Sequence, residues 1–298
     1  MTFRNFWQPL VGLYGEGEAR AIARLVMERR FSLSMTDIAC GSVEGIDEEE
    51  LTDIRERLIK GEPVQYVLRE TEFCGRRFRV EPGVLIPRPE TEELCRKAVE
   101  VTAAMVAVVA MESQRKERDG RYSVLDVGTG SGCIACTVAL EMQRLEALPT
   151  TEVTAWDISD RAIGIARSNA DALGAKVNVE KQDALTPPDD FHRWDIIVSN
   201  PPYVCEKEKM AMHENVLGHE PAEALFVPDD DPLLFYRAIG RYAVRALKPW
   251  GTLLLEINPL YASELQELLS VLGFAEVEIQ EDVFGKKRFA VARDAATL

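Results

Sequence analysis

A seven-residue run, Asp126-Val127-Gly128-Thr129-Gly130-Ser131-Gly132, constrains the fold of this chain most, because glycine recurs at every second position. The run ends an apolar stretch at 123–127, typical of a buried strand, and precedes a helical pattern at 133–144. Glycine lets the backbone turn sharply and lie close to a ligand, where a Cβ atom would clash. The sequence therefore predicts a strand, a ligand-binding turn and a helix.

Strand and helix patterns alternate through the rest of the chain. Strands are predicted at 153–156, 177–180, 195–199 and 252–257, and helices at 160–173, 232–247 and 261–272. Two final runs, 275–280 and 288–292, predict a hairpin around Gly285-Lys286. This order is typical of a doubly wound α/β domain, whose mostly parallel sheet ends in an antiparallel hairpin. Ligands of such domains bind at the carboxyl ends of the strands.

The chain before this domain has a different pattern. Two helices are predicted, one at 16–30 and one that begins after Asp47, which has Glu50 three residues on in a capping-box pattern, and ends at Gly61-Glu62-Pro63. We therefore expect a small helical substrate-docking domain at 1–71, a β-hairpin linker at 72–90 and the ligand-binding domain at 91–298. Within these parts the sequence predicts a turn at Gly75-Arg76-Arg77, a long helix at 90–111 and a charged surface loop at 112–121.

Charge, apolar runs and cysteine content disfavour several classes of function. The 50 acidic and 35 basic residues give a formal net charge of −15, which disfavours stable nucleic-acid binding. No targeting segment is visible and the longest apolar run, 101–111, is too short to span a bilayer, so we expect a cytoplasmic protein without membrane association. Cys133 and Cys136 form a C-x-x-C pair that lacks a second pair or nearby histidines. Structural packing is expected for them, rather than a metal or redox role.

The glycine run favours one cofactor over another. A nicotinamide fingerprint needs a sixth-position glycine, and Cys133 stands there. G-x-G-x-G after an acidic residue suits S-adenosylmethionine instead. Asp157, at the end of the next strand, is placed to accept both ribose hydroxyls. Asp183 either accepts from the adenine amino group or is a helix N-cap or loop residue. The predicted cofactor-binding residues are Asp126, Gly128, Thr129, Gly130, Gly132, Asp157, Ile158, Asp183, Ala184 and Asn200.

The segment Ser199-Asn200-Pro201-Pro202-Tyr203 follows another apolar strand. Its two prolines hold the backbone extended and leave carbonyl groups without local partners, Asn200 offers a side-chain carbonyl, and Tyr203 offers a flat ring. Together they predict a receptor for a planar NH₂ group, which needs positioning rather than a strong base. We therefore predict Asn200, Pro201, Pro202 and Tyr203 as catalytic residues, with no histidine acid–base pair and no metal. The alternative is a proline-rich turn that closes a strand.

These motifs together resemble a known family. Asn-Pro-Pro-Tyr with G-x-G-x-G is similar to class I methyltransferases that act on amino groups. Gly61-Glu62-Pro63-Val64-Gln65-Tyr66, Glu72-Phe73 and Leu85-Ile86-Pro87-Arg88-Pro89-Glu90-Thr91-Glu92 resemble the release-factor glutamine N5-methyltransferases. The resemblance implies a seven-stranded methyltransferase sheet and methyl transfer from S-adenosylmethionine, leaving S-adenosylhomocysteine. The acceptor would be the glutamine side-chain amide in the Gly-Gly-Gln motif of peptide chain release factors. We expect a monomer.

The resemblance also implies residue roles. Asn200 and the backbone of Pro201 would hold the acceptor amide beside Tyr203, and Gly128, Gly130 and Asp157 would bind the cofactor. Ile86-Pro87-Arg88-Pro89 would wall the active site, and Glu220 would be a structural hydrogen-bond partner. Asn258-Pro259 stands where the family often shows a glycine, and 112–121 looks like an insertion; neither is expected to touch the acceptor motif.

Three alternatives remain at this point. Adenine N6-methylation of DNA or RNA shares the acceptor motif, but would need a basic cleft and a target-recognition region. A cofactor-binding interaction protein without catalysis would have little reason to keep that motif intact. An NAD-dependent oxidoreductase would need the glycine that Cys133 replaces.

Overall fold

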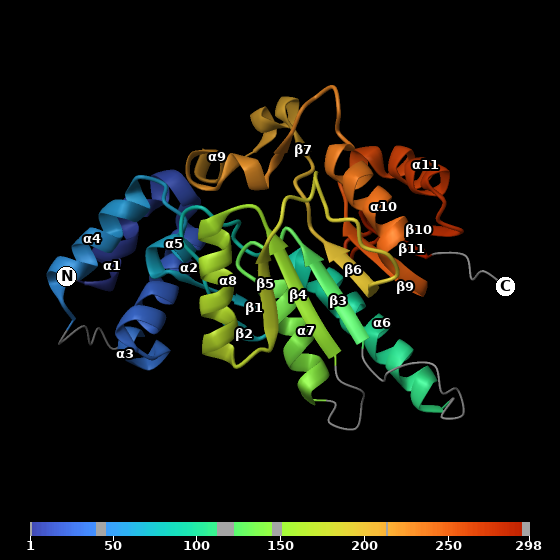
Figure 1. The fold of residues 1–298 in the computed structure, drawn as a ribbon. Coiled ribbons are helices and arrows are strands. Elements are labelled where there is room, and N and C mark those ends of the chain that lie inside the picture. The colour runs from blue at the N-terminus through green and yellow to red at the C-terminus, as the bar shows by residue number, and fades with distance from the viewer. Residues whose placement is uncertain (1, 40–45, 112–121, 145–150, 213, 294–298) are drawn as a thin grey trace.

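The computed structural model describes residues 2–39, 46–111, 122–144, 151–212 and 214–293. Its centre is a seven-stranded sheet in the order β10-β11-β9-β6-β3-β4-β5 (Figure 1). The five strands from β9 to β5 run parallel, and β11 lies antiparallel to both β9 and β10, as the sequence predicts. The strands are β3 (Tyr122–Val127), β4 (Thr151–Asp157), β5 (Val177–Lys181), β6 (Trp194–Ser199), β9 (Leu247–Glu256), β10 (Glu276–Glu281) and β11 (Lys287–Arg293).

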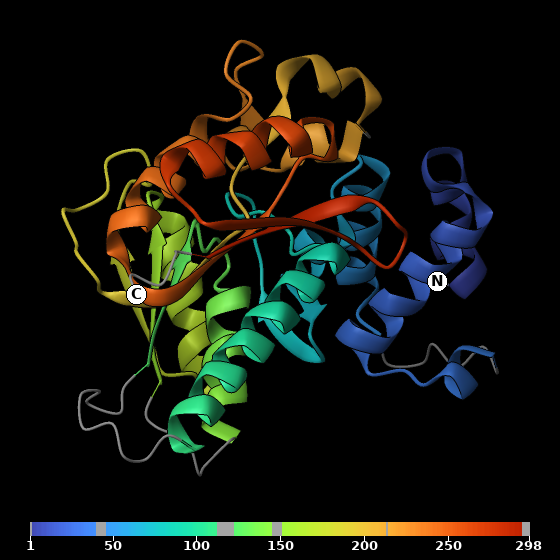
Figure 2. The same cartoon turned by 90° about the vertical axis from the view of Figure 1, so that its right-hand side faces the viewer.

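Helices cover both faces of the sheet. On one face lie α6 (Pro89–Met111), α7 (Cys133–Arg144) and α8 (Asp160–Leu173), and on the other lie α10 (Leu234–Ala246) and α11 (Ala262–Leu272). Figure 2 shows this layering from the side, with the orange-red helices and the green α6 on opposite sides of the strands. Apolar residues spaced by three or four along each helix face the sheet, as with Tyr236, Ile239 and Ala243 of α10. None of the helices in the described ranges is long and apolar enough to cross a membrane.

Short helices form the N-terminal part and pack around a core of their own. Its members include Phe6, Leu10, Val26, Leu51 and Leu58. The helices are α1 (Phe3–Trp7), α2 (Val11–Phe31), α3 (Met35–Ala39), α4 (Glu48–Ile59) and α5 (Val64–Leu68), with a 3-10 turn at Gln8–Leu10. The predicted helix at 16–30 begins earlier than expected because α2 continues through a break at Gly15, whose φ is 76°.

The capping box predicted at the start of α4 is only half formed. The Asp47 carboxylate accepts hydrogen bonds from the backbone N–H groups of Glu49 and Glu50. The Glu50 side chain does not reach back to Asp47, because it pairs instead with Arg30 of α2. The Asp47 cap therefore starts α4, and Glu50 ties this helix to α2.

A hairpin, β1 (Glu70–Phe73) and β2 (Arg76–Arg79), connects the N-terminal helices to the sheet domain. Its turn lies at Cys74 and Gly75, one residue earlier than predicted, because both of these residues have positive φ angles, 49° and 69°. Phe73 and Phe78 of the hairpin pack edge to face in the core of the sheet domain, with ring centroids 6.0 Å apart. The predicted loop at 112–121 lies outside the described residues.

The segment between β6 and α10 contains elements that the sequence patterns did not predict. These are β7 (Val204–Cys205) and β8 (Phe226–Val227), which pair in parallel, the helix α9 (Glu214–His219), and 3-10 turns at Glu206–Ala211 and Ala222–Ala224. Another 3-10 turn, Pro259–Tyr261, precedes α11. The strand predicted from Thr252 begins at Leu247, because pairing with β6 starts there and then shifts register past Trp250, whose φ is 71°.

Candidate active site

The glycine loop joins β3 to α7 at the carboxyl end of the sheet. Gly128, Gly130 and Gly132 all have positive φ angles, 73°, 56° and 80°. A Cβ atom at Gly128 or Gly130 would meet no atom within 4 Å, whereas one at Gly132 would lie 3.1 Å from the Cβ of Ala166. Gly128 and Gly130 therefore border open space that a ligand can fill, and Gly132 permits the close packing of the loop against α8.

Asp126 lies under this loop with its carboxylate buried. One carboxylate oxygen, Oδ2, accepts from the Thr129 hydroxyl at 2.7 Å and from the Ala135 backbone N–H at 3.2 Å. The other, Oδ1, is buried without a hydrogen-bond partner in the described chain. Burial raises the pKa of Asp126 to about 7, against the two hydrogen bonds that lower it. A buried acceptor of this kind fits a ligand that brings an ammonium group.

Asp157 ends β4 beside the same loop. Its carboxylate accepts from the backbone N–H of Gly130 and of Ser159, each at 2.9 Å. Burial raises the pKa of Asp157. The next side chain, Ile158, is 57 % exposed and gives a flat base ring an apolar surface to pack against. The pair is thus placed to take a nucleoside next to the glycine loop.

Asp183 and Ala184 follow β5 at the same edge of the sheet. The Asp183 carboxylate accepts from the Leu185 backbone N–H at 2.8 Å and from the Thr186 hydroxyl at 3.4 Å. These contacts make Asp183 a loop residue rather than a helix N-cap, and they leave its remaining lone pairs for an adenine amino group. Ala184 is half-buried against the core on the α10 side of the sheet.

The acceptor motif follows β6, whose residues are all buried. Asn200 donates its Nδ2 group to the Thr91 hydroxyl at 3.0 Å, and no donor among the described residues reaches its Oδ1. Pro201 is buried, while Pro202 and Tyr203 are half-buried. The Tyr203 hydroxyl donates to Glu256 at 3.0 Å, and burial next to this carboxylate raises its pKa. The motif thus offers the Asn200 carbonyl and a fixed aromatic ring at one edge of the sheet.

Thr91, Glu256 and Asn258 support the motif, and the sequence patterns assigned none of them a role. Thr91 and Glu256 are buried and joined by a hydrogen bond of 2.7 Å. Asn258 Nδ2 donates to the Tyr203 carbonyl at 3.1 Å and to Glu208 at 2.9 Å. The expectation that Asn258-Pro259 would not touch the acceptor motif is therefore wrong, because the 3-10 turn after β9 folds the Asn258 side chain back onto Tyr203. Spacing alone carries no signal for these contacts.

The Ile86-Pro87-Arg88-Pro89 segment lies between the N-terminal helices and the sheet domain. Glu220 accepts from the Ile86 backbone N–H at 3.0 Å and from Arg88 at 2.6 Å, as expected of a structural hydrogen-bond partner. Beside the segment is a cavity of about 370 Å³. Its lining comes from α2, α5, the β1–β2 hairpin and this segment, and includes Arg29, Gln65, Glu72, Pro87 and Arg88.

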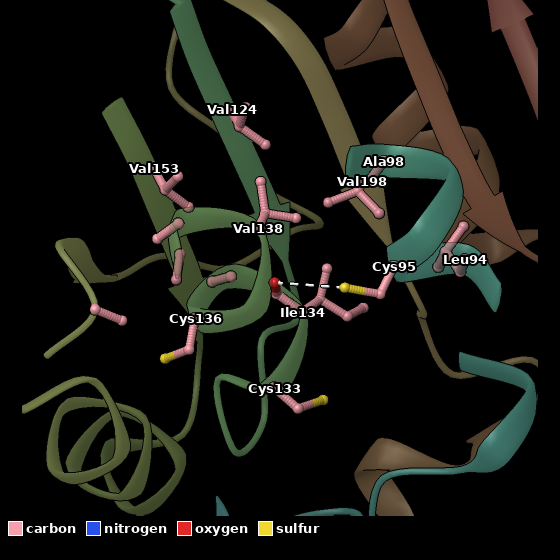
Figure 3. Close-up of a cluster of buried hydrophobic side chains, with 14 of the residues drawn as sticks. Leu94, Cys95, Ala98, Val124, Cys133, Ile134, Cys136, Val138, Val153 and Val198 are labelled. Carbon is pink, nitrogen blue, oxygen red and sulfur yellow. Dashed lines mark hydrogen bonds between the residues drawn. The ribbon is translucent and has the colours of Figure 1, made fainter. Parts of the chain in front are cut away.

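Cys133 and Cys136 lie in the first turn of α7, and Figure 3 shows their sulfur atoms pointing in different directions within the core. Both are free thiols, and burial raises the pKa of each, to about 12 for Cys136. Neither belongs to a metal-binding group, because no cluster of three candidate ligands occurs in the described ranges. The burial of both side chains in the core supports the packing role that the sequence predicts.

Comparisons with known proteins agree with this geometry. The sequence model of the Methyltransferase small domain family matches residues 100–225. A release factor glutamine methyltransferase of Bacteroides thetaiotaomicron is 41 % identical over 96 % of both chains, and one of Bacillus subtilis is 35 % identical over 91 % of this chain and 90 % of that relative.

A solved structure supports the fold. The hMettl16 catalytic domain, solved in complex with the MAT2A 3'UTR hairpin 6, superposes with a TM-score of 0.51 at 16 % identity. It covers 73 % of this chain and 74 % of that one. At this identity the match concerns the sheet and helix arrangement alone. The near-full-length relatives decide the assignment: this chain belongs to the release factor glutamine methyltransferase family.

Proposed function

We propose that this chain methylates the side-chain amide nitrogen (N5) of the glutamine in the Gly-Gly-Gln motif of peptide chain release factors. The cofactor is S-adenosylmethionine, and S-adenosylhomocysteine is the product. The observation that carries the proposal is the Asn200 amide, whose Nδ2 is engaged by Thr91 while its Oδ1 has no donor in the described chain. That oxygen lies in the strand-end motif of β6, the strand next to β3 and its glycine loop.

The residues of the cofactor site fit the parts of S-adenosylmethionine. The open space over Gly128 and Gly130 suits the amino-acid tail, and the unpartnered Oδ1 of Asp126 suits its ammonium group. Asp157 would accept from the ribose hydroxyls, Ile158 would pack on the adenine, and Asp183 and Ala184 would border the base. Thr129 and Gly132 hold the shape of the loop. When bound, the cofactor supplies an electrophilic methyl group on its sulfonium centre.

The residues that bind the substrate glutamine must make its amide nitrogen, a poor nucleophile, react. The lone pair of an amide nitrogen is delocalised, so the attack requires orientation of the nitrogen more than removal of a proton. Asn200 Oδ1 and the Pro201 carbonyl would accept the two N–H groups, and Tyr203 would pack beside the amide plane, with Pro202 keeping the backbone extended. These acceptors become more favourable as positive charge develops on nitrogen, so they stabilise the transition state selectively.

The remaining parts of the molecule are given roles in binding the protein substrate. We assign residues 1–71 as a substrate-docking domain, 72–90 as a β-hairpin linker and 91–298 as the methyltransferase domain. Support comes from the separate core of the N-terminal helices and from the cavity beside Ile86-Pro87-Arg88-Pro89. We further propose that the enzyme is a cytoplasmic monomer that needs no stable contact with nucleic acid, consistent with its net charge of −15.

Mass spectrometry tests the proposal. A purified class-1 release factor is incubated with this protein and S-adenosylmethionine, next to an Asn200→Ala variant as control. One added methyl group on the Gly-Gly-Gln glutamine, absent with the variant, is the expected result. A wild-type protein that binds adenosylhomocysteine but leaves the release factor unmodified, while methylating adenine in DNA or RNA, would contradict it.

A further inference from the structure

Two buried polar residues meet behind the acceptor motif. Thr91, in the first turn of α6, is 3 % exposed, and Glu256, at the end of β9, is 1 % exposed. The Thr91 hydroxyl lies 2.7 Å from Glu256 Oε2 and 3.0 Å from Asn200 Nδ2, and the Tyr203 hydroxyl lies 3.0 Å from Glu256 Oε1. One carboxylate therefore contacts both functional side chains of the motif, Tyr203 directly and Asn200 through Thr91.

The chemistry of these groups fixes the direction of every hydrogen bond. An ionised carboxylate only accepts, so the Thr91 hydroxyl must donate to Glu256. Having used its proton, the Thr91 oxygen is left to accept, and the partner it accepts from is Asn200 Nδ2. With its NH₂ end held at Thr91, the Asn200 amide turns its Oδ1 the other way. The charge of Glu256 thus decides which end of the Asn200 amide faces the acceptor site.

We propose that Glu256 is a positioning residue, which acts through the Thr91 hydroxyl to present Asn200 Oδ1 to the acceptor amide and acts on Tyr203 to hold its ring. The inference rests on the proposed role of Asn200 and adds to it the reason for the orientation of its side chain. Burial raises the pKa of Glu256 above its usual value, although the hydrogen bonds from Thr91 and Tyr203 and the charge of Arg288 oppose this shift and favour the ionised carboxylate. A carboxylate buried at this cost, with both oxygens used, is expected to have a specific function.

Glu256→Gln tests the direction of the hydrogen bonds without changing the shape of the side chain. The Gln amide has an NH₂ donor at one end. If this end faces Thr91, the Thr91 hydroxyl must accept from it and is free to donate to Asn200, so the Asn200 amide turns its oxygen toward Thr91. If it faces Tyr203, the Tyr203 hydroxyl has to accept instead of donate. We expect kcat for the release factor to fall by about 10-fold or more, with KM nearly unchanged because most binding contacts lie elsewhere. Adenosylhomocysteine affinity should stay at the wild-type value.

Variants of Thr91 test whether Glu256 acts on Asn200 through the Thr91 hydroxyl, a connection that we call the relay, or only stabilises the fold. Thr91→Ser keeps the hydroxyl and should retain most of the wild-type kcat. Thr91→Val removes the hydroxyl and should lower kcat. The loss caused by Glu256→Gln should be smaller in the Thr91→Val background, because the link to Asn200 is already broken. Thr102→Val is the matched control, since this buried hydroxyl of the same helix donates to the Ala98 carbonyl at 2.6 Å and bonds to no other described residue. Equal losses from Glu256→Gln in both backgrounds, or no loss, would overturn the proposal.

A measurement without substrate tests the orientation of the Asn200 side chain independently of the proposed methylation of release factors. In asparagine-labelled protein, the side-chain ¹H–¹⁵N signals of Asn200 are identified by their loss in Asn200→Asp. We expect one slowly exchanging Asn200 amide proton, and a clear shift of both signals in Glu256→Gln but not in Thr102→Val. Asn200 signals that are unchanged in both Glu256→Gln and Thr91→Val would refute the action of Glu256 on Asn200, because the second variant removes the hydroxyl that holds the Asn200 NH₂ group whichever way the Gln amide turns. If the wild type methylates no release factor, the proposed function fails. The Asn200 signals then still show whether Glu256 orients Asn200 through Thr91.

Discussion

Glu220 and Arg88 lie 132 residues apart in the sequence and form an ion pair of 2.6 Å, in which the Glu220 side chain is 1 % exposed. The same carboxylate accepts from the backbone N–H of Ile86 at 3.0 Å. It therefore joins the Ile86-Pro87-Arg88-Pro89 segment to the polypeptide that follows α9. A single buried acid thus holds in place the segment that the family resemblance implies as one wall of the active site.

Replacing this acid should be costly. Glu220→Ala leaves the Ile86 N–H and the Arg88 guanidinium without their partner, so we expect the free energy of unfolding to fall by about 2–4 kcal/mol. Denaturant unfolding measures the change. Asp189→Ala is the control, because Asp189 also pairs with an arginine but its side chain is 91 % exposed, and it should cost less than about 1 kcal/mol. Equal effects of the two variants would contradict this role of Glu220.

The glycines of the loop should respond differently to the same substitution. Gly132→Ala places a Cβ atom 3.1 Å from that of Ala166, so it should lower the melting temperature strongly. Gly128→Ala meets no atom within 4 Å and carries only the strain of its positive φ, about 1–2 kcal/mol. Its main effect should be weaker adenosylhomocysteine binding, because the new methyl group fills the space left for the ligand. Calorimetry and thermal unfolding of both variants test this contrast.

Asp126 predicts a pH dependence of stability. Its pKa is raised from 3.8 to about 7, so the folded protein holds a proton that the unfolded chain releases at lower pH. The stabilisation from this proton is complete below about pH 4 and is lost as the pH rises through about 7. Between about pH 5.5 and pH 8.5 the wild type should therefore lose about 2 kcal/mol relative to Asp126→Asn. If the free energies of unfolding of the two proteins changed with pH in parallel, the raised pKa of Asp126 would be excluded.

The buried thiols predict resistance to alkylation. Because burial raises the pKa of Cys133 and Cys136, little thiolate forms at neutral pH. Iodoacetamide should leave both unmodified in the folded protein and label both after denaturation, as read by peptide mass spectrometry. Labelling of either residue under native conditions would reopen a redox role for the C-x-x-C pair.

Much of this fold follows from local patterns in the sequence. Helices α7 and α8 begin and end where their apolar spacing predicts, because amphipathic periodicity is a local property that packing on a sheet then uses. The strands β3, β4 and β6 were likewise recognisable from apolar runs, with Asp126 near the end of β3, Asp157 at the end of β4 and Asn200 directly after β6. Since parallel strands end at one edge of the sheet, the sequence also brought the glycine loop and the acceptor motif to one site.

The contacts that hold these residues in place join segments that are far apart in the sequence. Thr91 and Glu256 lie 165 residues apart, and Asn258 contacts Tyr203 from 55 residues away. No periodicity encodes such pairs, because hydrogen bonds between distant segments depend on the register of the sheet and on the path of the loops around it. The sequence specified the reactive groups through local patterns. Their orientation, including which end of the Asn200 amide faces the acceptor, arises only when buried polar groups must all be satisfied together in the folded chain.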